Sequence, residues 1–412
     1  MSASGNNTPP HFGGISFARH SDSLTLHLSI GAELLLLKVD RADFSLSEIS
    51  RLALPALVQY VVAHPTRSLL YVASSNRTAL PSEEFHRLTT VALDERTGAM
   101  RTVVDTVLPS RPIHLTIAPD GSGLLVAYNL PGRVTWHAID GVGVALPHTP
   151  QDPEPVTGAY PHQVRVLPSG RAAVLLVRGN HPMHGRTHED PGALRFLSFD
   201  GGVLANLDTL APGAGFDFGP RHLDFHPGGR WAALSMERQN EIQVFEVEPT
   251  RFAELPTFTT TTLRRTAPEG SRTHPDQLCS AIHFNARGDR LYIANRHDPS
   301  VYGRAGQACE RGGNNLAVYA FDERSGTAEL LQHVATESVH VRTFSLDESS
   351  RLLVAASILP ALLQRDGALD QVPARLSFFR VADDGTLALA RVHDMPNERP
   401  RQMFWSRLNG RL

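Results

Sequence analysis

Histidine, arginine and glutamate recur at matching places in repeated stretches of this sequence, and together they can transfer protons beside a bound anion. Residues 221–237 read RHLDFHPGGRWAALSME, so Arg221 and Glu237 stand sixteen residues apart at its ends. His162 begins a related stretch, and Arg296 ends another. An imidazole exchanges protons near neutral pH, a carboxylate can act as a base, and a guanidinium grips carboxylate or phosphate oxygens. These residue types predict acid–base chemistry on an anionic compound.

The offset of sixteen residues applies to six stretches of the chain. Their first residues are Gln59, Ile113, His162, Arg221, Ser280 and Arg342. Their last residues are Ser75, Asn129, Arg178, Glu237, Arg296 and Ile358. Arg401 begins a further copy of the first segment. Five of these positions are arginine, against one glutamate and one histidine, so a site built from them is predicted to be locally positive.

Each stretch has the pattern of a β-hairpin. Two short runs rich in Val, Leu, Ala and aromatic residues flank a turn of Pro, Gly, Asp or Ser. A further strand follows, such as EIQVFEVE at 241–248 or ARLSFFRVADDG at 374–385, and then a less regular segment. Four strands in a unit that repeats every ~50 to 60 residues are typical of a propeller blade.

The two ends of the chain are expected to complete a seventh blade. Residues 15–39 resemble a hairpin plus a third strand, and residues 401–408 repeat the first strand. The prediction is an all-β, seven-bladed β-propeller with four-stranded antiparallel blades, closed by the C-terminal strand, which removes open sheet edges. One domain would span residues 13–412 after a flexible segment at 1–12. The alternative is an open β-solenoid or two sandwiches.

Blade geometry predicts where the repeated polar residues meet. A hairpin reverses direction, so the start of its first strand and the end of its second lie at one end. With the turn centred on Gly229, Arg221 and Glu237 are expected to be cross-strand neighbours. Inner strands line the channel of a propeller, so these positions should ring its mouth. The long connections after residues 179, 296 and 358 should wall the same side.

Bulk composition narrows the class of partner. A net charge of −3 supplies no general field for a nucleic acid, so we expect no nucleic-acid partner. The two cysteines, Cys279 and Cys309, are interpreted as free thiols in a reducing compartment. The first residues do not read as a signal peptide, and no run reaches the ~20 apolar residues of a membrane span. A soluble cytoplasmic protein, monomeric or weakly dimeric and without a cofactor or a membrane partner, is predicted.

Three stretches carry a family resemblance: residues 219–248 (GPRHLDFHPGGRWAALSMERQNEIQVFEVE), 161–171 (PHQVRVLPSGR) and 280–296 (SAIHFNARGDRLYIANR). The chain resembles the propeller-type lactonase family, which includes the bacterial propeller form of 6-phosphogluconolactonase and the fungal carboxy-cis,cis-muconate lactonizing enzyme. The resemblance covers nearly the whole chain in blade order. It departs at Tyr160 and Pro161, where the family has a small residue and cysteine, and at Arg342, which Val341 and Thr343 flank instead of proline and glycine.

The resemblance implies a catalytic set of His162, Arg221, Glu237 and Arg296. The expected reaction is hydrolysis of an anionic sugar-acid lactone similar to 6-phosphogluconolactone, with Glu237 or His162 as general acid or base and Arg221 stabilising the oxyanion. The expected substrate-binding residues are Arg178, His222, His283, Arg342, Arg401, Gln59 and Asn129. Formation of a lactone from a muconate-like acid, and a non-catalytic propeller that binds an acidic metabolite or protein, are the alternatives.

Plainer interpretations compete with these roles. Arg221 with Glu237 could be a structural ion pair, and His162 a structural histidine. His64, His222, His226 and His283 fit the blade pattern as structural residues. His181, His184, His188, Glu189 and Asp190 match no strong ligand spacing, so no metal site is expected. Cys279 lies beside Ser280 but lacks an adjacent activating base, which argues against a nucleophilic cysteine.

Overall fold

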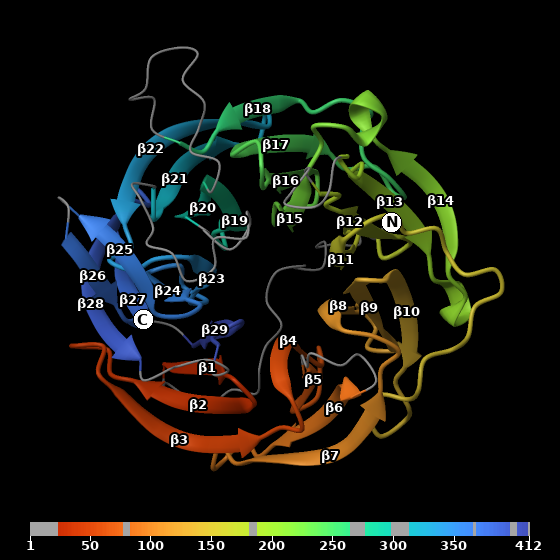
Figure 1. Ribbon diagram of the computed structural model, residues 1–412, viewed down its shortest axis with the longest axis horizontal. Coiled ribbons are helices and arrows are strands. Elements are labelled where there is room, and N and C mark those ends of the chain that lie inside the picture. The colour runs from red at the N-terminus through yellow and green to blue at the C-terminus, as the bar shows by residue number, and fades with distance from the viewer. Residues whose placement is uncertain are drawn as a thin grey trace, which may run out of the picture.

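Seven antiparallel sheets stand radially around one axis in the computed structural model (Figure 1). The structure describes residues 24–76, 83–180, 188–263, 277–297, 313–365, 368–395 and 402–410. The seven-bladed propeller predicted from the repeats is therefore confirmed. The expected domain boundary at residue 13 and the N-terminal segment 1–12 lie outside the described residues.

The strands of each blade follow one another outward from the axis. The first three blades are β29 (Ser406–Asn409), β1 (Thr25–Ile30), β2 (Glu33–Val39), β3 (Leu46–Ala53); β4 (Leu57–Ala63), β5 (Leu69–Ser75), β6 (His86–Leu93), β7 (Met100–Val107); and β8 (Pro112–Ile117), β9 (Gly123–Asn129), β10 (Gly132–Ala138). The next two are β11 (Pro161–Val166), β12 (Ala173–Val177), β13 (Ala193–Ser198), β14 (Ala205–Leu210); and β15 (Pro220–Phe225), β16 (Trp231–Met236), β17 (Glu241–Glu246), β18 (Phe258–Thr261). The last two are β19 (Gln277–Phe284), β20 (Arg290–His297), β21 (Asn315–Asp322), β22 (Thr327–Ala335); and β23 (Val341–Leu346), β24 (Leu352–Ser357), β27 (Ala374–Val381), β28 (Leu387–Met395). A separate hairpin, β25 (Ala361–Arg365) with β26 (Ala368–Val372), interrupts the seventh blade, and two 3-10 turns span Asp200–Gly202 and Pro212–Gly215.

The C-terminal strand closes the ring, as predicted. β29 pairs antiparallel with β1, with Asn409 opposite Thr25 and Ser406 opposite Leu28. β29 thus takes the inner place in the first blade, and β1, β2 and β3 are its second, third and fourth strands. Residues 15–23, which were expected to begin the N-terminal hairpin, lie outside the described residues.

The third blade departs from the predicted four strands. Within the described residues it has three, and an irregular segment lies along its outer strand, β10. The amide of Leu146 donates to Ala138 O at 2.9 Å, and the amide of Thr149 donates to Trp136 O at 2.9 Å. Prolines at 147, 150 and 153 interrupt this segment. Because proline has no amide hydrogen, it cannot continue a ladder of hydrogen bonds, so no regular fourth strand forms.

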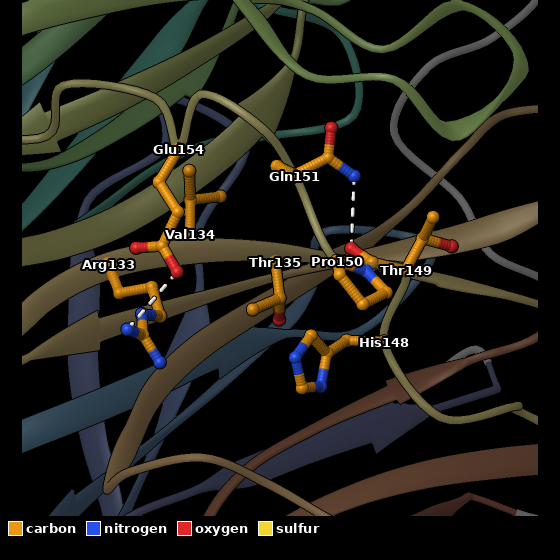
Figure 2. A pocket seen from close by; sticks show the side chains of 8 residues that line it. All are labelled: Arg133, Val134, Thr135, His148, Thr149, Pro150, Gln151 and Glu154. Atoms are coloured by element: carbon orange, nitrogen blue, oxygen red, sulfur yellow. Dashed lines mark hydrogen bonds and ion pairs between the residues drawn. The ribbon is translucent and has the colours of Figure 1, made fainter.

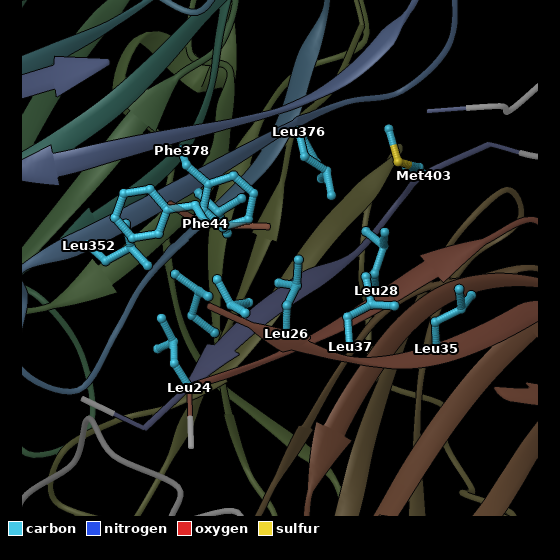
Figure 3. Close-up of a cluster of buried hydrophobic side chains, with 14 of the residues drawn as sticks. Leu24, Leu26, Leu28, Leu35, Leu37, Phe44, Leu352, Leu376, Phe378 and Met403 are labelled. Atoms are coloured by element: carbon cyan, nitrogen blue, oxygen red, sulfur yellow. The ribbon is translucent and has the colours of Figure 1, made fainter. Parts of the chain in front are cut away.

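The apolar core lies between neighbouring blades. In one cluster, Leu26 and Leu28 of the first blade pack with Leu376 and Phe378 of the seventh (Figure 3). Phe44 joins them, and its ring stacks on Phe378 with centroids 5.8 Å apart. Equivalent clusters join the other neighbouring blades, for example the fourth to the fifth and the sixth to the seventh. Such close-packed layers fix the inner strands relative to one another, which allows side chains from different blades to form one site.

Other features bear on single predictions. Cys279 is a buried free thiol, as expected, whereas Cys309 lies outside the described residues. Among the residues that the structure describes, no helix has both the length and the apolar character that crossing a bilayer requires.

Candidate active site

Within the described residues, a register shift interrupts the inner strand at the first position of each of the six repeated stretches. The shifts fall at Gln59, Ile113, His162, Arg221, Ser280 with Ala281, and Arg342. A β-bulge of this kind leaves a residue outside the regular pairing and redirects its side chain. The repeated positions therefore carry six equivalent β-bulges, which are arranged around one axis.

The bulge corrects the predicted register. Glu237 pairs with Gly219 rather than with Arg221, and its amide donates to Gly219 O at 3.0 Å. The same shift appears in the fourth blade, where the amide of Arg178 donates to Tyr160 O at 3.1 Å. The hairpin register differs by one position from the offset of sixteen, and the extra residue in the inner strand moves the main-chain pairing by one more. Arg221 and Glu237 nevertheless meet through their side chains.

Glu237 is the centre of an ion cluster built by three successive blades. Its Oε1 forms an ion pair with Arg221 Nε at 2.7 Å and accepts a hydrogen bond from Arg296 Nη2 at 2.6 Å. Its Oε2 accepts one from Arg178 Nη1 at 2.7 Å. We call Glu237 and these three arginines the arginine cluster. It brings together four of the residues that the sequence predicts for the site.

The cluster holds Glu237 ionised. Burial raises the pKa of this carboxyl, but the positive charges of Arg178, Arg221 and Arg296 lower it by more, so the pKa lies well below its ordinary value. Arg342 adds further positive charge close to Arg221. A carboxylate that three guanidiniums stabilise is a weak base near neutral pH. Glu237 is therefore suited to holding the arginines in place rather than to abstracting a proton.

The arginines differ in access to solvent. The side chains of Arg221 and Arg296 are 1% and 3% exposed, whereas that of Arg178 is 22% exposed. Arg342 is half-buried, and its guanidinium lies 5.0 Å from the centroid of the Phe404 ring. Arg178 and Arg342 are thus the positive groups that a molecule in the channel can reach. Arg221, which the sequence predicts to stabilise the oxyanion, is more deeply buried than either of them.

His162 lies beside the arginine cluster and is neutral at physiological pH. Only 9% of the residue is exposed, and its ring packs against that of His222 with centroids 4.9 Å apart. Burial lowers the pKa of His162 well below its ordinary value, and the neighbouring Arg221 and His222 lower it further. These shifts make His162 a weak base too, but one nitrogen of its neutral ring keeps a free lone pair, whereas both carboxylate oxygens of Glu237 are occupied by arginines.

Three further residues complete this region, and the repeat pattern did not single them out. Nη1 of Arg296 contacts Nε2 of His340, which directly precedes the inner strand of the seventh blade. The guanidinium of Arg178 lies 5.9 Å from the ring centroid of Tyr160, and Phe404 lies under Arg342. Each stands in a connection next to a ring position, which is the sequence signal that could have indicated them, and Tyr160 also stands out as a departure from the family pattern.

Other predicted ring residues lie away from the cluster. Gln59 Oε1 accepts hydrogen bonds from Arg111 Nε at 3.1 Å and Nη2 at 2.8 Å, between the second and third blades. Asn129 is half-buried at the end of β9 in the third blade. Ser280 donates to main-chain oxygens of Ala294 and Val341, which is a structural role. Arg401 lies outside the described residues.

His283, which the sequence predicts as a substrate-binding residue, lies further along the channel than the arginine cluster. Its Nδ1 is 3.8 Å from Asp224 Oδ2, and Asp224 Oδ1 is 3.3 Å from Arg165 Nη2. Asp224 follows Arg221 by three residues on β15, so it stands about 10 Å along the strand from the cluster. His283 therefore belongs to a second polar group in the channel.

Two histidines have the structural role predicted for them. His64 Nδ1 accepts the amides of Thr66 at 3.2 Å and Arg67 at 3.1 Å, and His226 Nδ1 accepts the amide of Gly228 at 3.0 Å. Both fix the turn of a hairpin.

Cys279 is unsuited to nucleophilic chemistry, as the sequence indicated. Burial raises the pKa of its thiol, and Sγ contacts Met236 O at 3.1 Å.

The connection after β12 reaches the cluster through Glu189. Its carboxylate pairs with Arg238 at 3.1 Å, next to Glu237 in sequence, and accepts the amide of Asp217 at 3.1 Å. Residues 181–187, which include His181 and His184, lie outside the described residues. In the described part of the chain, no three His, Cys, Asp or Glu side chains converge as metal ligands would.

A small hollow lies at the outer edge of the third blade, where the irregular segment replaces a strand (Figure 2). Its volume is about 80 Å³, and Arg133 pairs with Glu154 across it at 3.2 Å. Glu154 is 59% exposed, so this pair is an ordinary surface contact. The grouped acid–base residues therefore lie at the axis and not in this hollow.

Comparisons with known proteins agree with this architecture. The family model "Lactonase, 7-bladed beta-propeller" matches residues 25–358. The chain is 26% identical over 281 residues to the 6-phosphogluconolactonase of Bacillus subtilis, covering 65% of this chain and 70% of that one. It is 23% identical over 316 residues to the 6-phosphogluconolactonase of an Enterobacter species, covering 76% of this chain and 81% of the relative. The solved periplasmic gluconolactonase of Pseudomonas aeruginosa superposes with a TM-score of 0.68 at 18% identity over 94% of this chain and 98% of that one. The chain belongs to the lactonase family of seven-bladed β-propellers.

Proposed function

We propose that this protein hydrolyses an anionic sugar-acid lactone at the axis of the propeller. The observation that carries the proposal is the arginine cluster, in which a buried carboxylate holds three guanidiniums beside the neutral imidazole of His162. Such a site offers a proton acceptor and a preorganised positive field, the two requirements for attack of water on an ester.

His162 is the general base in this proposal. It takes a proton from water as the oxygen attacks the acyl carbon, and the carbonyl oxygen becomes an oxyanion. The ring C–O bond then breaks, and the departing ring oxygen takes the proton back from His162. Arg178 is the accessible guanidinium of the cluster, so we assign it to the oxyanion. Glu237 acts by holding Arg178 in position, and Arg221 and Arg296 in turn fix Glu237.

The charge balance supports an anionic substrate. Three arginines surround one carboxylate, and Arg342 adds a fourth positive charge, so the region remains positive after Glu237 is counted. A phosphate or carboxylate on the substrate would find two guanidiniums within reach, Arg178 and Arg342. The curated relatives from Bacillus subtilis and Enterobacter are 6-phosphogluconolactonases, which favours a phosphorylated sugar lactone.

A lactone panel tests the proposal. Purified protein is mixed with 6-phosphogluconolactone and with unphosphorylated gluconolactone, and hydrolysis is followed by proton release. We expect hydrolysis of both, a higher kcat/KM for the phosphorylated compound, and loss of that preference in Arg342→Ala. Absence of hydrolysis with either lactone, or equal activity in wild type and His162→Gln, would contradict the proposal. Tight binding of the acids without turnover would instead support a non-catalytic propeller, and closure of a muconate-like acid would support lactone formation.

A further inference from the structure

A row of titratable side chains runs along the channel away from His162. His222 packs against His162 with ring centroids 4.9 Å apart. Asp224 follows His222 by two residues on β15, on the same face and about 7 Å along the strand. His283 on the neighbouring β19 completes the row, with Nδ1 3.8 Å from Asp224 Oδ2.

The row begins at a buried side chain and ends at a solvent-exposed one. His162 is 9% exposed as a residue, whereas the side chain of His283 is 36% exposed and that of Asp224 is 19% exposed. The direction is away from the arginine cluster, because Asp224 lies three residues past Arg221 along β15. The row therefore extends from the proposed reaction centre toward the opposite end of the channel, and its step of about 7 Å from His222 to Asp224 requires a bridging water.

The proposed reaction needs an outlet for protons. A lactone and one water give a hydroxy acid, and near neutral pH that acid ionises to a carboxylate and one proton. The proton must leave the site in every turnover. Release of the proton past the arginine cluster is unfavourable. The guanidiniums repel another positive charge at short range, and this repulsion is strong because the site is poorly solvated.

We propose that His162 takes the proton of the newly formed carboxylic acid, and that His222, His283 and Asp224 carry this proton from His162 to solvent at the end of the channel opposite the arginine cluster. This inference rests on the proposed lactone hydrolysis. No bond other than O–H and N–H bonds changes in the transfer, and the final acceptor is water or a buffer molecule.

The surrounding charges give the transfer a direction. A positive charge on His162 or His222 would face Arg221, Arg342 and, at His222, the rings of His114 and His283. A positive charge on His283 would instead face the Asp224 carboxylate, and the Phe344 ring packs edge-to-face with His283 at a centroid separation of 4.8 Å. Coulombic attraction to Asp224 therefore draws the proton outward.

Asp224 is held in the form that this role requires. Burial raises the pKa of its carboxyl, but the nearby His283 ring and the charge of Arg165 lower the pKa by more, so the group stays ionised. The amide of Phe284 donates to Oδ2 at 3.0 Å and keeps the carboxylate beside His283. His222 needs only to pass the proton on, because a neutral imidazole accepts at one nitrogen and donates from the other.

Turnover in weak buffer tests the row. The full chain and the variants Asp224→Asn and His283→Gln are compared by loss of the lactone carbonyl band in the infrared, in millimolar and in concentrated imidazole buffer. We expect kcat of both variants to fall about 10-fold in weak buffer with KM unchanged, and to recover in imidazole, which can take up the proton directly.

Thr116→Val is the matched control. Thr116 follows the bulge residue Ile113 by three positions on β8, as Asp224 follows Arg221 on β15, and it does not titrate in this range. It should keep wild-type kcat in both buffers. Unchanged kcat of His283→Gln in weak buffer, or a loss that imidazole does not restore in variants with wild-type thermal unfolding, would overturn the relay and leave the proposed function standing. A wild-type protein inactive on the lactone panel would overturn both.

Discussion

Arg221 Nε lies 2.7 Å from Glu237 Oε1, although Arg221 stands in a bulge and the main chain of Glu237 pairs with Gly219. The two side chains are each 1% exposed. A buried pair of this kind contributes little net stability compared with apolar residues, but removing one partner leaves the other charge uncompensated. The pair is therefore best tested by a variant that removes its charge and keeps its shape.

Glu237→Gln should lower both stability and activity. The amide cannot balance Arg178, Arg221 and Arg296, so we expect a loss of about 3–5 kcal/mol in the free energy of unfolding by urea. Activity on the preferred lactone should fall at least about 100-fold, because Arg178 loses its fixed position. Glu189→Gln is the control, since its pair with Arg238 is more exposed, and it should cost less than half as much stability. Equal losses in the two variants would contradict the central place of Glu237.

Arg178→Lys should separate charge from geometry. Lysine keeps the positive charge but lacks the planar fork that lets Arg178 hold Glu237 and face the channel together. We expect kcat to fall about 10-fold or more. Arg195→Lys, in which the lost contact is with Thr209 on the outer part of the same blade, should leave kcat unchanged. Steady-state kinetics with the preferred lactone would decide, and a change confined to KM would assign Arg178 to ground-state binding alone.

Stability should fall as the pH is lowered into the acid range. The pKa of Glu237 in the folded protein is below its ordinary value of 4.5, so its contribution is complete above that pH and is lost progressively as the pH falls below it. Urea unfolding between neutral pH and pH 3 measures this slope. Glu237→Gln should have a flatter profile below about pH 4.5 than the wild type. Parallel profiles would show that another carboxylate determines the acid sensitivity.

How far the sequence predicts this molecule depends on the kind of feature. Repeated hairpins predict seven blades and the convergence of Arg221, Glu237 and Arg296, because each unit folds in the same way around one axis. The residue pattern does not reveal the bulges at the ring positions. One extra residue at the start of an inner strand leaves the alternation of apolar residues in the rest of the strand unchanged, so the strand is predicted without the bulge. The prolines at 147, 150 and 153 could have indicated the three-stranded third blade. The position of His283 along the channel could not be predicted, because the sequence does not show how far β19 is displaced along the axis relative to β15.

Packing between blades yields a further prediction at Gly288. This residue has φ +81°, and a Cβ built on it would lie 2.1 Å from Nε2 of the buried His226 in the preceding blade. Gly288→Ala should therefore destabilise the protein. Gly170→Ala is the matched control, because φ is +71° there and no atom lies within 4 Å of the added carbon. Gly288→Ala should lose about 1–3 kcal/mol more than the control in urea unfolding. Equal losses would mean that His226 moves aside without cost.

Closure of the ring joins parts of the chain that are made at very different times. Ser29 Oγ donates to Trp405 O at 3.1 Å, across a separation of 376 residues, and the adjoining β29 covers the inner edge of β1. During synthesis on the ribosome, the inner edge of β1 in the first blade stays unpaired until all the other blades have been synthesised. A nascent chain of this kind is exposed to intermolecular strand pairing for most of its synthesis, and the final strand ends that risk.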